Sequence, residues 1–226
     1  MFFHAPEIWA DFPELVAGGL TVEGGCADGG MALDLASLHA RARERLAAGP
    51  EGEFPEIQAW RRAFAKLGLK PTQYRCASEA LLRRLRQTGE VPTIHPLIDL
   101  CNAVSLATAL PIAVFDRAGI TGALSVRLAR GDERYEAFSG EVETPAPGEV
   151  IFADDAGNAH ARRWCNRQSR KSAVSDETTQ ALIVVEALHA GAEVGIQRAL
   201  VLLTQQLGLR ATIPTRLTAA EPFYRF

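Results

Sequence analysis

Residues 97–116 read LIDLCNAVSLATALPIAVFD, and a change of pattern within this stretch decides the fold. After Pro96, residues 97–110 repeat apolar side chains at helical spacing, which predicts a helix that ends at Pro111. Residues 112–115 are mostly β-branched and aromatic, which predicts a strand. Most helical patterns precede this point, and most strand patterns follow it. We therefore expect an α+β fold rather than a doubly wound sheet.

The chain before this helix predicts one strand and three further helices. Leu15–Glu23 is an apolar run punctuated by glycines, which predicts the strand. Ser78 can cap one helix because its hydroxyl can accept a hydrogen bond from an N–H of the first turn, and Gly89 provides the stop. The expected helices cover residues 32–48, a segment through Trp60, Phe64 and Leu67 that ends at Gly68, and residues 79–88.

The chain after Pro111 predicts short strands separated by turn residues. Residues 181–187 (ALIVVEA) form an almost wholly apolar run, which is typical of a buried strand. Residues 196–207 predict a closing helix that ends at Gly208. The remaining expected strands cover Ile112–Phe115, Leu124–Leu128, Arg134–Ala137 and Glu149–Ala153.

The charge balance limits the ways in which the protein can bind nucleic acid. A formal net charge of −3 argues against coating nucleic acid through bulk electrostatics, because such binding needs many cations that displace counterions from phosphates. The charge is uneven, however, and Arg83, Arg84 and Arg86 share one expected helix. They are candidates for RNA contacts, and the alternative is an ordinary solvated helix surface.

Several further patterns in the sequence indicate the cellular compartment of the protein. The four cysteines are widely spaced with no CxxC pair, which fits a reducing compartment. The first residues, MFFHAPEIWADFPEL, lack the basic region and apolar run of a secretory signal. No stretch has the roughly 18 apolar residues that a membrane span needs. We therefore expect a cytoplasmic protein without a membrane partner.

The sequence lacks the familiar metal-binding and nucleotide-binding motifs. None of the five histidines stands at HExxH or similarly tight spacing, so no metal site is expected. No P-loop, GxGxxG or GxSxG element occurs. The pairs Gly24-Gly25 and Gly29-Gly30 lack the fingerprint spacing and predict a flexible loop. No cofactor is expected.

One polar cluster, residues 161–171 (ARRWCNRQSRK), combines several cations with a tryptophan. Arginine forks bind phosphate or carboxylate well, and an indole can stack on a base. The cluster also lies between apolar runs, where loops often carry sites. The alternative is a charged surface loop with one buried tryptophan.

Several collinear segments match a known pattern. They are Leu97–Asn102, Leu110–Asp116, Ser139–Val142 (SGEV), Glu149–Asp154 (EVIFAD), and Ser172–Thr178 (SAVSDET) with residues 181–187 after it. Together they resemble the B3/B4 editing domain of the phenylalanyl-tRNA synthetase β-subunit. The match is closer to the free-standing version of this domain, through Tyr74–Leu85, Ile94–Leu106 and Arg162–Ser169.

The resemblance implies a mixed or antiparallel β-sheet with packed helices and a pocket at the sheet's edge. It is strongest over residues 60–190. We expect residues 1–226 to form one B3/B4-like domain, in which residues 1–55 add a strand and helices and residues 191–226 form a closing helix and tail. The implied partner is tRNA or aminoacyl-tRNA, bound weakly or transiently, or a small amino-acid-like ligand.

The same resemblance implies a substrate pocket and an aminoacyl-ester hydrolysis. The ester is labile, so positioning a water and holding the oxyanion can suffice. No catalytic nucleophile is identified, since Ser169 has no base nearby in sequence. The alternatives are a module that binds tRNA or a small molecule without chemistry, and a protein-interaction domain. The expected substrate-binding residues are Asn102, Ser105, Arg163, Asn166, Arg167, Gln168, Ser169 and Arg170.

Two positions depart from the pattern that this chain resembles. Ala113 stands where the synthetase domain has a histidine that lines the editing pocket. Arg170 stands where that domain has a glutamate that recognises the phenol hydroxyl of tyrosine. Replacing an acceptor with a cation removes such recognition. We therefore do not expect this protein to remove tyrosine from phenylalanine tRNA.

Overall fold

The computed structural model describes residues 1–24 and 34–226. The flexible-loop prediction therefore lies outside the described residues, apart from Gly24, and so does Cys26. Each predicted helix is present, with small shifts at its ends. The α-helices of the described residues are α1 (Pro6–Asp11), α2 (Leu35–Ala48), α3 (Pro55–Lys66), α4 (Ala77–Thr88), α5 (Pro96–Thr108) and α6 (Ala192–Leu207).

The helix ends follow local signals, with one exception. His95 caps α5 because its Nδ1 accepts a hydrogen bond from Leu97 N at 3.2 Å. Gly89 ends α4 in the left-handed conformation, as expected. The prediction that Ser78 caps α4 was wrong. The cap is Cys76, and Ser78 lies buried in the first turn because Ala77 N bonds to Cys165 O, which starts the helix earlier.

The strands divide between two sheets, a division that the sequence did not specify. The four-stranded sheet is antiparallel and has the order β11-β2-β10-β3, with β2 and β10 as its long central strands. Its strands are β2 (Val16–Glu23), β3 (Ile112–Asp116), β10 (Gln180–Ala187) and β11 (Thr215–Leu217).

The eight-stranded sheet is mixed. Its order is β12-β1-β4-β7-β8-β5-β6, and β9 pairs with β8 off this path. The pairs β1–β4 and β5–β8 are parallel and the others are antiparallel. Its strands are β1 (Phe2–His4), β4 (Leu124–Leu128), β5 (Arg134–Glu136), β6 (Val142–Glu143), β7 (Val150–Asp154), β8 (Asn158–Arg162), β9 (Arg167–Gln168) and β12 (Phe223–Tyr224).

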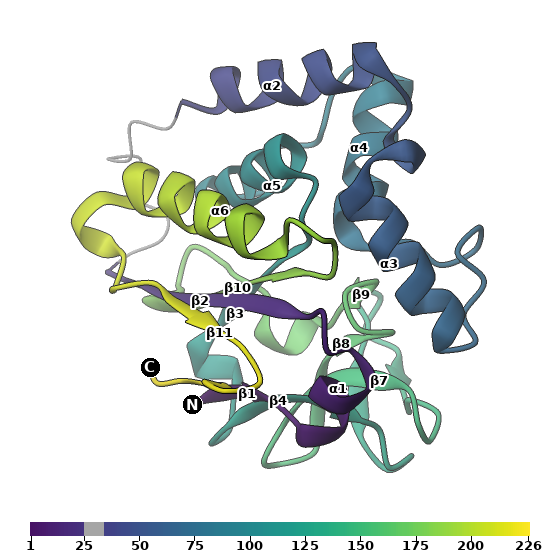
Figure 1. The fold of residues 1–226 in the computed structure, drawn as a ribbon. Helices are drawn as coiled ribbons and strands as arrows, with labels where there is room; N and C mark the ends of the chain where they lie inside the picture. Colours follow the sequence, from purple (N-terminus) through teal and green to yellow (C-terminus); the bar gives the residue numbers. More distant parts are fainter. Residues whose placement is uncertain (25–33) are drawn as a thin grey trace.

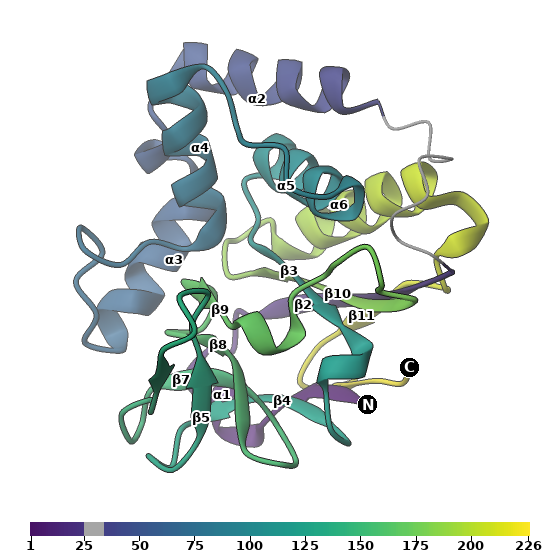
Figure 2. The same ribbon diagram turned by 180° about the vertical axis from the view of Figure 1, so that it is seen from behind.

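The four-stranded sheet is the middle layer of the molecule. Helices α5 and α6 cover one of its faces, with α2 above them, and the eight-stranded sheet lies toward the other face (Figure 1). The same layers are visible from behind, with α3 and α4 standing at the side (Figure 2). The α+β class and the mixed and antiparallel sheets are therefore confirmed.

Strand β10 is buried on both faces because its alternate side chains enter two different cores. Leu182 and Val184 belong to the core that also contains Phe115 and Phe152. Residues of opposite parity pack with α5 and α6, among them Ile183 and Val185. This explains why the run 181–187 lacks the apolar–polar alternation of a half-exposed strand.

Gly18 lets α6 approach β2 closely. A Cβ at Gly18 would lie 2.9 Å from Ile196 Cγ2 and from Leu200 Cδ1. A side chain here would collide with the helix.

Among the described helices, none combines the length and apolar character needed to cross a membrane.

Candidate functional site

The polar cluster of the sequence folds into a hairpin, which we call the 162–169 hairpin after its residues. Strands β8 and β9 pair Arg162 with Arg167. In the turn between them, Arg163 and Trp164 have φ values of 46° and 59°. Positive φ is rare for bulky side chains, and strained backbone of this kind persists only where the surroundings hold it in place. Here Trp164 N donates to Val150 O at 2.7 Å, so β7 holds the turn.

Trp164 anchors the hairpin in the core. Its side chain is completely buried and packs edge-on against Trp60, with 5.0 Å between ring centroids, and against Phe12 at 4.9 Å. Its Nε1 donates to Glu186 Oε1 at 2.8 Å. The indole is therefore a buried anchor and is not exposed for stacking on a base.

Arg162 clamps the base of the hairpin. It is buried, and its guanidinium donates to Glu149 Oε1 and Oε2 at 2.9 and 2.8 Å and also to Glu143. Burial tends to raise the pKa of the Glu149 carboxyl, but hydrogen bonds from Arg162 and from Arg163 N outweigh it and hold this pKa below its usual value. Arg162, Glu149 and Glu143 therefore form a largely buried ion-pair network at the base of the hairpin.

A small pocket lies beside the hairpin, between the two sheets. Asn166, Arg167 and Gln168 line it from the hairpin, Ala113 lines it from β3, and Glu186 lines it from β10. Its volume is about 70 Å³. Since water occupies about 30 Å³ in the liquid, this inter-sheet pocket holds about two waters or one small chemical group.

The polar side chains of the inter-sheet pocket are already paired. Gln168 Nε2 donates to Val114 O at 2.6 Å and so bridges the hairpin to β3. Asn166 Nδ2 donates to Arg75 O at 2.8 Å. Arg167 is 42% exposed and pairs with Glu143 Oε1 at 3.1 Å. Because an exposed pair of this kind is weak, Arg167 can turn toward a ligand at little cost.

Glu186 is a functional candidate that the sequence reasoning missed. It is 2% exposed, and its Oε1 accepts hydrogen bonds from Trp164 Nε1 and from His4 Nε2 at 2.7 Å. Glu186 also lines the inter-sheet pocket. The sequence signal for it was a single carboxyl in the otherwise apolar run ALIVVEA. Burying an acid is costly unless the acid is paired or has a functional role.

The thiols near the pocket are poor nucleophiles. Burial raises the pKa of the Cys76 thiol to about 11, and it raises that of Cys165 well above its ordinary value. Thiols react as thiolates, so neither group is activated at neutral pH. Cys165 lines the pocket only as a small apolar surface.

A buried row of interacting polar side chains lies away from the pocket. His160 Nδ1 is 2.8 Å from Ser172 Oγ, and His160 Nε2 is 3.2 Å from Asp154 Oδ2. The three residue types match those of a hydrolase triad, but all three side chains are buried and none lines the inter-sheet pocket. These three side chains instead connect β7 and β8 to the segment that follows the hairpin.

The structure brings some of the expected substrate-binding residues together and separates others. Asn166, Arg167 and Gln168 line the inter-sheet pocket. Asn102 and Ser105 lie on α5 and do not line it; Ser105 is buried and donates to Leu110 O at 2.6 Å.

The remaining expected substrate-binding residues also lie outside the pocket lining. Arg163 stacks on the Tyr74 ring, with Cζ 4.6 Å from the ring centroid. Ser169 is buried and donates to Glu136 O at 2.8 Å. Arg170 is exposed, 3.9 Å from a Glu136 carboxyl oxygen. Of the two departures from the family pattern, Ala113 therefore lines the pocket and Arg170 does not.

The three arginines proposed for RNA share α4, but two have partners in the protein. Arg86 and Arg83 lie 2.6 and 3.9 Å from the carboxyl oxygens of Glu51, which is buried. Arg84 is exposed and makes no ion pair with any residue that the structure describes. Arg84 is therefore the member of this group that is most available to an external phosphate.

Comparisons with known proteins identify the family of this chain. The B3/4 domain family model matches residues 59–206. The phenylalanine–tRNA ligase β-subunit of Zymomonas mobilis is 32% identical over 105 residues, which cover 46% of this chain and 13% of that protein. The β-subunit of Cereibacter sphaeroides is 38% identical over 76 residues, 34% of this chain and 9% of that protein. The chain thus spans only about an eighth of the curated relatives that it matches.

A solved structure shares the fold. It is an N-terminal fragment of the phenylalanyl-tRNA synthetase β-subunit from Pyrococcus horikoshii, with a TM-score of 0.50 and 12% identity. The match covers 93% of this chain and 48% of that one. The family match contains the 162–169 hairpin, β3 and β10, which supply most of the inter-sheet pocket lining. The chain belongs to the B3/4 domain family.

Proposed function

We propose that this protein hydrolyses the ester of an aminoacyl-tRNA in the inter-sheet pocket, as a trans-editing enzyme. One observation carries the proposal: Asn166, Arg167, Gln168 and Glu186 converge on a pocket within the segment that the family model matches. Carboxamide, guanidinium and carboxyl groups are suited to orient an aminoacyl ester and a water.

The reaction requires no covalent intermediate. A water attacks the ester carbonyl, the bond from the carbonyl carbon to the ribose oxygen breaks, and the ribose oxygen takes up a proton. The products are the free amino acid and a tRNA with a free terminal hydroxyl. Arg167 is placed to stabilise the developing oxyanion, because its exposed pair with Glu143 leaves the guanidinium free to turn. The Glu186 carboxyl, which lines the pocket, is the acceptor assigned to the ammonium group of the amino acid.

The pocket favours a small aminoacyl side chain. Its volume of about 70 Å³ leaves no room for a large aromatic ring. Gln168 crosses between the hairpin and β3, and its bond to Val114 O must open to admit a larger group.

Deacylation of a panel of mischarged tRNAs tests this function. The wild-type protein is expected to release the amino acid from at least one pair. Arg167→Ala is expected to lower that rate by about 100-fold, which is typical of removing a group that stabilises an oxyanion. Arg62→Ala, which removes an exposed arginine of α3, is the matched control and should retain the rate. Equal rates for wild type and Arg167→Ala would remove Arg167 from this role.

A second candidate is a binding module without chemistry, and the closed state of the pocket favours it. Both carboxamides are committed to backbone carbonyls, and the volume is small. In that case an amino-acid-like ligand would raise the melting temperature while no tRNA in the panel is deacylated.

A further inference from the structure

A second and larger cavity lies among the helices. Its volume is about 420 Å³, within the range of about 300–1,000 Å³ that is common for ligand sites. Residues of α2, of the N-terminal half of α3, of the end of α5 and of the start of α6 line it. No residue is shared with the inter-sheet pocket. We call it the helical cavity.

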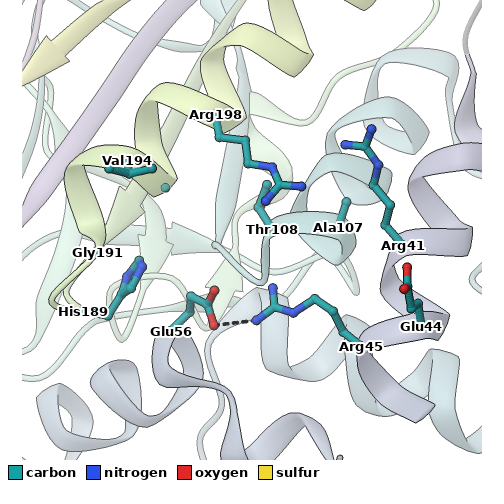
Figure 3. Close-up of a pocket in the computed structure, with 11 residues that line it drawn as sticks. Arg41, Glu44, Arg45, Glu56, Ala107, Thr108, His189, Gly191, Val194 and Arg198 are labelled. Atoms are coloured by element: carbon teal, nitrogen blue, oxygen red, sulfur yellow. Dashed lines mark hydrogen bonds and ion pairs between the residues drawn. The ribbon is translucent and has the colours of Figure 1, made fainter. Parts of the chain in front are cut away.

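The charges that line the helical cavity do not cancel. Arg45 Nη2 pairs with Glu56 Oε2 at 2.8 Å, and these two neutralise each other. Arg41 and Arg198 also line the cavity, against Glu44. Neither Arg41 nor Arg198 forms an ion pair with any residue in the described parts of the chain. In Figure 3 these two side chains extend from opposite sides of the cavity, one from α2 and one from α6.

The first turn of α6 adds donors to the same cavity. Gly191, Val194 and Gly195 line it, and no side chain caps this 16-residue helix. The free N–H groups of a helix start carry partial positive charge, which favours an anion.

The His189 imidazole packs on that turn. A Cβ at Gly195 would lie 3.2 Å from its Cε1, so the glycine makes room for the ring. His189 Nδ1 is buried and has no hydrogen-bond partner among the described residues. The His189 ring therefore forms part of the cavity wall beside the helix start, with this nitrogen turned away from solvent.

We propose that the helical cavity binds the phosphate group of a ligand, held between Arg41 and Arg198 at the start of α6. Guanidinium forks match phosphate oxygens in pairs, and a helix start supplies further donors. The cavity is larger than a phosphate alone needs, so the organic part of the ligand also fits. The shared chemistry is a phosphate, whether it belongs to a small molecule or to an RNA.

The proposal does not depend on the editing function. The two sites share no lining residue, so the helical cavity would bind phosphate even if the inter-sheet pocket hydrolysed nothing. Loss of deacylation in Arg167→Ala and loss of phosphate binding in a helical-cavity variant are therefore separable results.

Isothermal titration with inorganic pyrophosphate at low ionic strength tests the site. The wild-type protein is expected to bind one equivalent. The double variant Arg41→Ala/Arg198→Ala is expected to bind about 100-fold more weakly, roughly tenfold for each lost charged hydrogen-bond donor. Both side chains are exposed, so the variant should fold, and circular dichroism checks this.

The control is Arg62→Ala/Arg225→Ala, which removes the same charge from exposed positions that do not line the helical cavity. It should bind within about twofold of wild type, since distant surface charges are largely screened. Absence of pyrophosphate binding, or an equal loss in both double variants, would overturn the proposal. Competition with a 5′-phosphorylated oligoribonucleotide then identifies the source: displacement of pyrophosphate assigns an RNA phosphate, and no displacement assigns a small phosphorylated molecule.

Discussion

Replacing Trp164 with alanine is expected to lower the free energy of unfolding by about 4 kcal/mol, the usual range for deleting a buried aromatic side chain being about 3–5 kcal/mol. The indole is fully buried against Trp60 and Phe12, and its removal leaves a cavity where three segments meet. It also removes a hydrogen bond to Glu186, a carboxyl that is itself buried. Urea unfolding followed by far-ultraviolet circular dichroism measures the change.

Two further variants make this result specific. Trp164→Phe keeps most of the ring contacts but loses the N–H donor, so it should lie between wild type and alanine. Phe138→Ala removes an aromatic side chain that is 66% exposed, and its effect should stay within about 0.5 kcal/mol. A loss below about 1 kcal/mol for Trp164→Ala would contradict the role of the indole as the anchor of the hairpin.

Replacing Arg162 with methionine is expected to lower the free energy of unfolding by about 3–5 kcal/mol. The reason is that removing one member of a buried ion network leaves the charges of its partners uncompensated. Glu149 has a side chain that is 10% exposed and takes two hydrogen bonds from Arg162. Methionine keeps much of the volume, so the loss reports the charge rather than a cavity. The same urea titration measures it.

The neighbouring arginine provides the comparison. Arg167 contacts the same Glu143 carboxyl as Arg162, but it is 42% exposed. Arg167→Met should therefore cost less than about 1 kcal/mol, as exposed ion pairs do. Similar losses for the two variants would show that burial does not separate their roles.

Local signals in the sequence predicted most of the helices and long strands. Pro96 and Pro111 bracket α5, and Gly89 ends α4. The strands β1 and β12 were missed, because each is at most three residues long and exists through long-range pairing: Phe2 lies opposite Tyr224 at the other end of the chain. No local pattern encodes such a partner, and the division into two sheets depends on the same kind of pairing.

The candidate site was predictable only in part. The cluster at residues 161–171 was recognised from its composition, but the separation of a buried Arg162 from an exposed Arg167 depends on how β8 and β9 pair. Glu186 was hidden within an apolar strand. Its partner His4 lies 182 residues away in sequence, so only the fold reveals their contact.

A crystal structure with a non-hydrolysable analogue shows whether the inter-sheet pocket receives the aminoacyl group. The probe is an adenosine that carries an amino acid through an amide in place of the ester. The aminoacyl group is expected to lie among Ala113, Arg167 and Glu186, with its ammonium on the Glu186 carboxyl. Gln168 is expected to be released from Val114 O if the group is large. An analogue bound elsewhere, with Gln168 unmoved and the inter-sheet pocket empty, would show that this pocket is not the aminoacyl site.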